Sequence, residues 1–150
     1  MTAVETEFPV SLRWRGGRLT GAVAPGNEPL EIATPPEFPG GLAGYWSPEE
    51  LLVAATASCF VLTLAAVAER REAPLLDATV AATGRLGRRH DGRFGFAAIE
   101  LQAELETVPG GEGAVRAAAA AAEERCLIAQ SLGVPVLLTV AVATAAATSS

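Results

Sequence analysis

The sequence has few of the residues that usually signal a particular chemistry. It contains no lysine, one histidine and two cysteines among 150 residues, and aromatic residues make up 5% of it. Without lysine, every basic side chain is an arginine, which stays charged and can bind a carboxylate or a peroxide bidentately. The single histidine, His90, stands in a predicted turn with no cysteine or second histidine near it, so we expect no metal site. With so few aromatic residues, alanine, leucine and valine must fill the interior.

The balance of charge and apolar residues excludes two further classes. The net charge of −6 argues against a nucleic-acid-binding protein, which needs a basic face. Hydrophobic residues make up 50% of the chain and charged residues 19%, which excludes disorder. We expect one domain over residues 1–150. So apolar a chain is also expected to cover part of its surface with a partner subunit.

No targeting or membrane segment is expected. Residues 1–7 are acidic and no apolar segment follows them, so we predict no secretory signal and a cytoplasmic protein. In a reducing cytoplasm, a pair of cysteines is more often redox-active than structural. Residues 51–68 carry no charge and just reach the lower length for a membrane span. Because this run is rich in alanine, we interpret it as a helix buried in protein.

The start of that helix is clearly marked. Ser47 is a candidate N-cap, Pro48 suits the first helical position, and Glu50 stands three residues after Ser47. This spacing predicts a capping box, in which Glu50 bonds back to the N-cap backbone. Glu49 has no such structural role and remains the freer carboxylate. We expect the helix to run to about Arg71.

The remaining segments predict an α+β fold. Three short strands are expected near residues 10–14, 18–23 and 27–34, and a hairpin at 76–88 and 93–105 around an Asp-Gly turn. A second helix is expected at 114–126 and a last strand at 134–142, with a frayed tail behind it. The order β-β-β-α-β-β-α-β with hairpins belongs to the α+β class.

Two interpretations of the cysteines remain open on these grounds. Cys59 falls inside the apolar helix, where loss of hydration raises a thiol pKa and disfavours the thiolate. Either Cys59 is a small core residue, or a cation from elsewhere in the fold activates it. Cys126 lies far along the chain, so the pair forms no Cys-x-x-Cys motif.

Several segments in sequence order resemble one family. Residues 47–60 read SPEELLVAATASCF and resemble the helix motif of the OsmC/Ohr family (osmotically inducible protein C and organic hydroperoxide resistance protein). The family's helix carries an Asn-Pro-Glu-x-Leu segment at the same distance before a reactive cysteine. Residues 16–18 match the turn with the family's arginine, residues 34–44 its loop before the helix, and Cys126 its second cysteine.

The resemblance implies a thiol-dependent peroxidase that reduces organic hydroperoxides. Cys59 would be the peroxidatic thiol, Arg18 would hold it as thiolate, Glu49 would fix Arg18, and Cys126 would resolve the sulfenic acid to a disulfide. Arg13 and Arg15 are the alternatives to Arg18 if the strand register differs. An external dithiol such as a lipoyl group would then reduce the disulfide. The apolar surroundings of Cys59 would receive the organic part of the substrate.

The family fold implied is α+β, an intertwined homodimer with two long central helices against sheets, without metal or cofactor. One departure is notable, because proline commonly follows the family's second cysteine and Leu127 follows it here. The alternative function is therefore an OsmC-like protein that binds an apolar ligand in the same pocket, with Cys59 unreactive.

Overall fold

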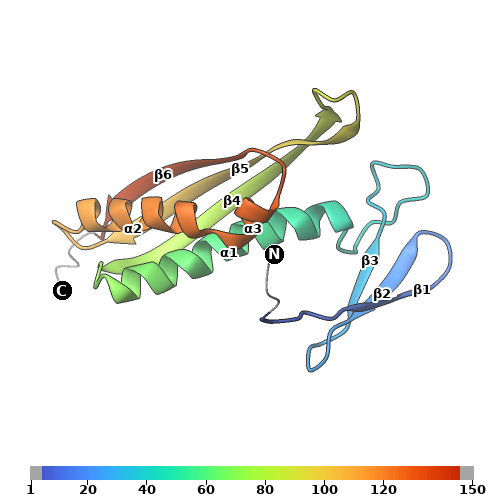
Figure 1. The fold of residues 1–150 in the computed structure, drawn as a ribbon, viewed down its shortest axis with the longest axis horizontal. Coiled ribbons are helices and arrows are strands. Elements are labelled where there is room, and N and C mark those ends of the chain that lie inside the picture. The colour runs from blue at the N-terminus through green and yellow to red at the C-terminus, as the bar shows by residue number, and fades with distance from the viewer. Residues whose placement is uncertain (1–4, 146–150) are drawn as a thin grey trace. The chain divides into compact units, whose positions relative to one another are not determined.

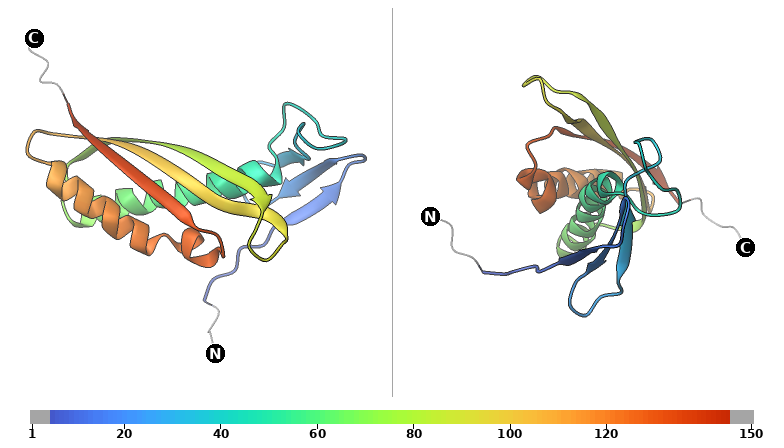
Figure 2. Two further views of the ribbon diagram at one scale, coloured as in Figure 1. Left: turned by 90° about the horizontal axis from the view of Figure 1, so that it is seen from above. Right: turned by 90° about the vertical axis from the view of Figure 1, so that its right-hand side faces the viewer.

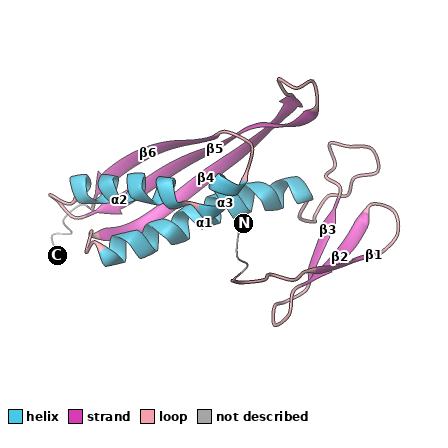
Figure 3. Cartoon of the chain, viewed as in Figure 1, coloured by secondary structure: helices cyan, strands magenta, loops and turns pink. Residues whose placement is uncertain are grey.

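The computed structural model describes residues 5–145 and divides between Leu51 and Leu52 into two compact units. We call residues 1–51 unit 1 and residues 52–150 unit 2. Each unit contains one three-stranded sheet, and the order of elements along the chain is β-β-β-α-β-β-α-α-β (Figure 3). The predicted α+β class is confirmed. Residues 146–150, most of the tail expected to fray, lie outside the described residues, as do residues 1–4 of the acidic N-terminal segment.

Unit 1 is an antiparallel meander whose turns the sequence predicts. Its strands are β1 (Ser11–Trp14), β2 (Leu19–Val23) and β3 (Leu30–Ala33), paired in the order β1-β2-β3. The turn between β1 and β2 holds Gly16 and Gly17 at φ values of 97° and 54°, which favour glycine. Trp14 fastens this turn by donating from Nε1 to the Gly17 carbonyl at 3.0 Å.

Helix α1 (Pro48–Arg70) begins with the predicted capping box. The Glu50 amide donates to Ser47 Oγ at 3.1 Å, and the Ser47 amide donates to Glu50 Oε1 at 3.2 Å. The helix therefore starts and ends within a residue of its predicted limits. Its only cap carboxylate is Glu50, which leaves Glu49 outside the box.

Unit 2 is built on a long hairpin. Strands β4 (Leu75–Arg88) and β5 (Phe94–Thr107) are antiparallel, and β6 (Val136–Thr144) runs parallel to β5 at its other edge. In the predicted turn, the Arg93 amide donates to Asp91 Oδ1 at 2.9 Å and Gly92 has a φ of 81°. The hairpin prediction is confirmed.

Helices α1 and α2 (Glu112–Arg125) pack on the same face of this sheet, as Figures 1 and 2 show. Successive side chains of a β-strand point to opposite faces of the sheet, so every second side chain of β5 points towards the helices. The buried side chains of this core are those of Phe60, Leu64, Val67 and Ala68 from α1, Ile99, Leu101, Ala103 and Leu105 from β5, Val115, Ala118, Ala119 and Ala122 from α2, and Cys126. Alanine, leucine and valine supply most of these buried side chains, as the composition predicts.

One face of α1 remains apolar and uncovered. Helix α1 is long and apolar enough to cross a membrane, but the core helix of a soluble protein passes the same test. In the most apolar 18-residue stretch of α1, 28% of the residues are buried. Leu64 is fully buried, whereas Leu62 is 69% exposed. The helix thus packs in the core along one stripe and exposes Leu62 on another side.

Candidate active site

Cys59 lies in α1 among the partly buried side chains that border the core of unit 2. Its thiol is free and half-buried, and its Sγ lies 4.0 Å from the hydroxyl oxygen of Thr63, one helical turn later. Residues four apart share one helix face, so α1 itself positions this hydroxyl beside the sulfur. A hydroxyl can donate to a thiolate and so favours ionisation.

Cys126 stands between two helices, and this position differs from the sequence prediction. We expected a helix to residue 126, but α2 ends at Arg125 and Cys126 is extended, with φ −65° and ψ 103°. A short helix, α3 (Leu127–Ser131), then begins, and the Gln130 amide donates to the Cys126 carbonyl at 3.0 Å. The extended residue breaks the helical ladder and turns the thiol inward, where Cys126 is 2% exposed.

The segment around Cys126 surrounds the Cys59 sulfur with donors. Burial raises the pKa of Cys59, but hydrogen bonds from the Ile128 amide and the Cys126 thiol lower it. The Thr63 hydroxyl and the Leu127 amide lower it further, so that the pKa of Cys59 falls below its ordinary value. These donors belong to unit 2, so the thiolate gains stability before any guanidinium is considered.

The pKa of the second thiol, Cys126, is shifted in the opposite direction. Burial raises the pKa of Cys126, and this outweighs the hydrogen bond from the Ala129 amide. The neighbouring Cys59 sulfur raises the pKa of Cys126 further, because a hydrogen bond and a nearby negative charge both favour the protonated thiol. The Cys126 sulfur also lies 4.0 Å from the Thr56 carbonyl oxygen. The structure thus brings together two thiols of different acidity, one prepared to ionise and one to remain protonated.

Removing the Thr63 hydroxyl is expected to raise the pKa of Cys59. Thr63→Val keeps the shape of the side chain and deletes the donor beside the sulfur, whereas Thr63→Ser retains the donor. The measurement is the alkylation rate of Cys59 against pH, with the modified peptide identified by mass spectrometry. Equal pKa values in Thr63→Val and Thr63→Ser would show that the hydroxyl does not act on the thiol.

Arg18 and Glu49 lie in unit 1 and do not form an ion pair with each other. The two ion pairs among residues 5–145 are Arg15 with Glu31 and Arg85 with Glu100. Glu49 Oε2 is buried and accepts no hydrogen bond from any described residue. The side chain of Arg18 lies against Gly40, where an added Cβ would come within 3.1 Å of Arg18 Cγ. The roles predicted for Arg18 and Glu49 towards Cys59 stay predictions.

An apolar cavity adjoins the second thiol. It has a volume of about 220 Å³ and is lined by Cys126 together with Phe60, Leu101, Ala129, Val134, Val136, Leu138, Glu123 and Gln130. A dry engineered cavity of about 150 Å³ is large enough for benzene, so this one suits a small hydrocarbon group. The apolar pocket was predicted at Cys59, whereas this cavity is lined by Cys126.

The donors around Cys59 were missed by the sequence analysis. The four-residue spacing of Cys59 and Thr63 on one helix was a usable signal. The amides of Leu127 and Ile128 gave none, because they reach the thiol from a segment far from Cys59 in the sequence. Among residues 5–145, no group of three His, Cys, Asp or Glu side chains is placed to hold a metal ion.

The comparison with protein families decides the relationship. The family model of OsmC-like proteins matches residues 40–141, which is more than half of the chain and includes both cysteines. The chain belongs to the OsmC family. The resemblance predicted from residues 47–60 and Cys126 is thereby confirmed.

Solved structures with OsmC names share this fold at low sequence identity. An OsmC-like protein of unknown function from Vibrio cholerae has a TM-score of 0.83 and 20% identity, over 91% of this chain and 100% of that one. An organic hydroperoxide resistance protein from Legionella pneumophila has a TM-score of 0.73 and 24% identity, over 95% and 99%. Another from Elizabethkingia anophelis has a TM-score of 0.71 and 22% identity, over 97% and 100%. No curated protein matches the sequence.

Proposed function

We propose that this OsmC-family protein is a thiol-dependent peroxidase that reduces organic hydroperoxides to alcohols. The observation that carries the proposal is the pair of adjacent free thiols with opposite pKa shifts, Cys59 lowered and Cys126 raised. A peroxidatic cysteine needs to be a thiolate. A neighbouring thiol that stays protonated does not compete with it for the peroxide, and when that thiol later attacks the sulfenic acid its proton leaves with the oxygen as water. Two of the structural relatives are named organic hydroperoxide resistance proteins, which agrees with this chemistry.

The reaction balances with these two residues and one external reductant. The Cys59 thiolate attacks the terminal peroxide oxygen, the O–O bond breaks, and an alkoxide leaves and takes up a proton to become the alcohol. Cys59 is then a sulfenic acid. The Cys126 thiol condenses with it to form a disulfide and release water. A dithiol such as a lipoyl group returns both cysteines to thiols and becomes a disulfide itself.

Arg18 and Glu49 complete the proposed site. A guanidinium beside Cys59 would add a full positive charge to the donors already present, and would hold the peroxide during attack. The unpartnered oxygen of Glu49 supports its role as the carboxylate that fixes this arginine, because a buried acceptor without a donor is costly. The packing of Arg18 on Gly40 restricts the side chain and so lowers the entropy lost on pairing.

The residue after the second cysteine, Leu127, affects the pKa of Cys59. Proline has no amide hydrogen, so the family's usual residue at this position cannot donate to the peroxidatic sulfur. Leu127 supplies that donor and lowers the pKa of Cys59. The departure from the family pattern thus strengthens the thiolate in this chain, and we expect it to leave resolution by Cys126 intact.

The proposed assembly is a cytoplasmic homodimer of single-domain chains, acting without metal or other cofactor. The uncovered apolar face of α1, including Leu62, supports a second copy as its partner. A homodimer would bury this face without the membrane that α1 could otherwise cross.

One equivalent of cumene hydroperoxide is expected to convert the two thiols to a Cys59–Cys126 disulfide. Peptide mass spectrometry would show a linked peptide pair that has lost two hydrogens, and dihydrolipoamide would restore the separate peptides. In the matched variant Cys126→Ser, dimedone would trap the sulfenic acid on Cys59. If both cysteines remained free after peroxide treatment, the peroxidase proposal would be wrong.

The second candidate function is binding of an apolar ligand without turnover. The apolar cavity beside Cys126 favours it, since a small hydrocarbon fits there and Cys59 does not line that cavity. In that case Cys59 would resist peroxide, and a hydrocarbon probe would bind the reduced protein and the Cys59→Ser variant equally well.

A further inference from the structure

The β4–β5 turn concentrates positive charge in an acidic protein. Residues 85–93 read RLGRRHDGR and hold four of the eleven arginines with one carboxylate, whereas the net charge of the chain is −6. Arg85 is neutralised by Glu100, which accepts from Arg85 Nη2 at 2.9 Å. An anion is therefore repelled by most of the molecule and attracted to this turn.

The other arginines of the turn keep most of their donors free. Among residues 5–145, no carboxylate lies within 4.0 Å of a nitrogen of Arg88 or Arg89. Arg88 donates from Nη1 to the Gly92 carbonyl at 2.9 Å, and Arg89 donates from Nη2 to the Gly133 carbonyl at 3.3 Å. A guanidinium has five N–H donors, and a charged acceptor forms stronger bonds with it than a carbonyl does.

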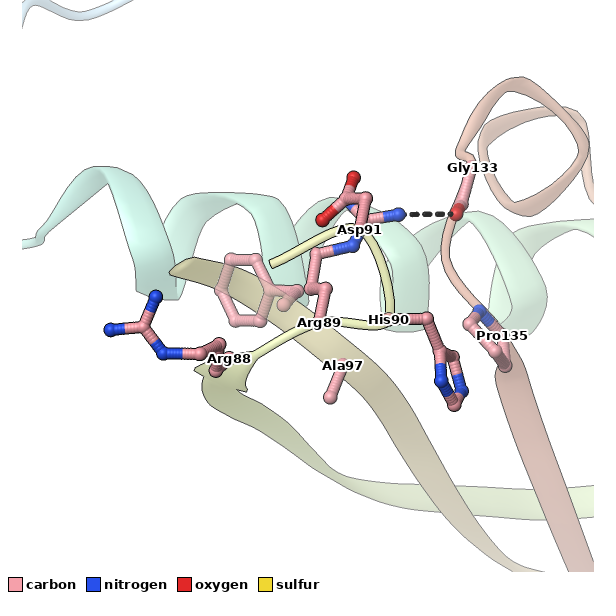
Figure 4. Close-up of a pocket in the computed structure, with 8 residues that line it drawn as sticks. Arg88, Arg89, His90, Asp91, Ala97, Gly133 and Pro135 are labelled. Carbon is pink, nitrogen blue, oxygen red and sulfur yellow. Dashed lines mark hydrogen bonds between the residues drawn. The ribbon is translucent and has the colours of Figure 1, made fainter. Parts of the chain in front are cut away.

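These side chains line a cavity between the turn and the segment that follows α3. Its volume is about 410 Å³, and it is lined by Arg88, Arg89, His90 and Asp91 from the turn and by Gly133 and Pro135 from the facing segment. The two guanidinium groups of this lining outnumber its one carboxylate. Figure 4 shows Arg89 reaching towards Gly133 and His90 lying on the side of Pro135. The volume exceeds that of a phosphate group, and Phe96, Ala97 and Pro135 provide apolar surface for a small organic part.

We propose that this cavity binds a small organic anion, with a phosphate or carboxylate head group held by Arg88 and Arg89 and its organic part against Phe96 and Pro135. The site lies in unit 2 at the far end of the hairpin and uses none of the residues assigned to the peroxidase chemistry. The anion-binding proposal therefore does not depend on the proposed peroxidase function.

Isothermal titration calorimetry with three probes of one ring size tests the proposal. Phenyl phosphate, benzoate and phenol are each titrated into the reduced full-length protein in phosphate-free buffer at low salt. We expect saturable one-site binding of phenyl phosphate or benzoate, and the tighter of the two identifies the head group. Phenol lacks the charge and is expected not to bind. Amide resonances of residues 88–97 and 133–135 should shift during the same titration.

The variants separate a specific site from general attraction. Arg89→Gln and Arg88→Gln are each expected to weaken binding about tenfold, the effect of one charge-assisted pair. Arg125→Gln, at the exposed end of α2, removes the same charge and is expected to change nothing. Circular dichroism confirms that each variant folds. The proposal would be overturned if neither phenyl phosphate nor benzoate bound saturably, or if phenol bound as tightly as the anions. It would also be overturned if Arg125→Gln weakened binding as much as Arg88→Gln or Arg89→Gln.

Discussion

Cys59→Ser is expected to lower hydroperoxide reduction by about a thousandfold or more. A serine hydroxyl does not ionise near neutral pH and forms no sulfenic acid, so the nucleophile is lost completely. The donors from Cys126, Thr63 and the α3 amides would then surround an oxygen that cannot use them. The measurement is the turnover of tert-butyl hydroperoxide with dihydrolipoamide as the reductant.

The control for this experiment is the adjacent position. Ser58 is exposed and its hydroxyl donates to the Ala55 carbonyl at 3.3 Å, away from the Cys59 sulfur. Ser58→Ala is therefore expected to retain the activity of the wild type. Turnover by Cys59→Ser within tenfold of the wild type would mean that another group performs the reaction.

Phe60→Ala is expected to reduce the free energy of unfolding by about 3–5 kcal/mol. Phe60 is 1% exposed and packs in the core between α1 and the β4–β6 sheet. Its removal deletes apolar contacts and enlarges the cavity that Phe60 shares with Cys126. Urea unfolding monitored by circular dichroism gives the difference in free energy of unfolding between wild type and variant. The slope of this free energy against urea concentration should be the same for both.

Leu62→Ala provides the matched comparison, because Leu62 lies two residues away on the same helix and is 69% exposed. Within a single chain its cost is expected to stay within about 0.5 kcal/mol. If the proposed homodimer covers Leu62, the cost will instead depend on protein concentration. A small cost for Phe60→Ala would contradict the packing of α1 described above.

Local signals in the sequence predicted the elements that depend on neighbouring residues. The capping box of Ser47 and Glu50 set the start of α1, and the Asp91-Gly92 pair set the β4–β5 turn. Both are formed by residues within three positions of each other, so their physics is contained in a short segment. The family motif in residues 47–60 was readable for the same reason.

Features that depend on packing between distant segments were not predictable in this way. The extended backbone at Cys126 and the start of α3 have no preceding cap or turn residue to mark them. The donors that α3 presents to Cys59 follow from how that helix lies against α1. The amides of Leu127 and Ile128 leave no side-chain pattern in the sequence, so a guanidinium was the predicted source of activation for Cys59.

The pKa of Cys59 tests the central claim most directly, and Leu127→Pro is the variant that isolates its cause. Cys126 already has the extended backbone that a following proline requires, and proline is favoured at the first position of a helix, so this variant should fold and lose one amide donor. The measurement is the rate of Cys59 alkylation against pH, followed by peptide mass spectrometry. We predict a wild-type pKa below the ordinary thiol value of about 8.5 and a higher value in Leu127→Pro. A wild-type pKa at or above about 8.5 would contradict the account, because Cys59 would then be a core thiol without special reactivity.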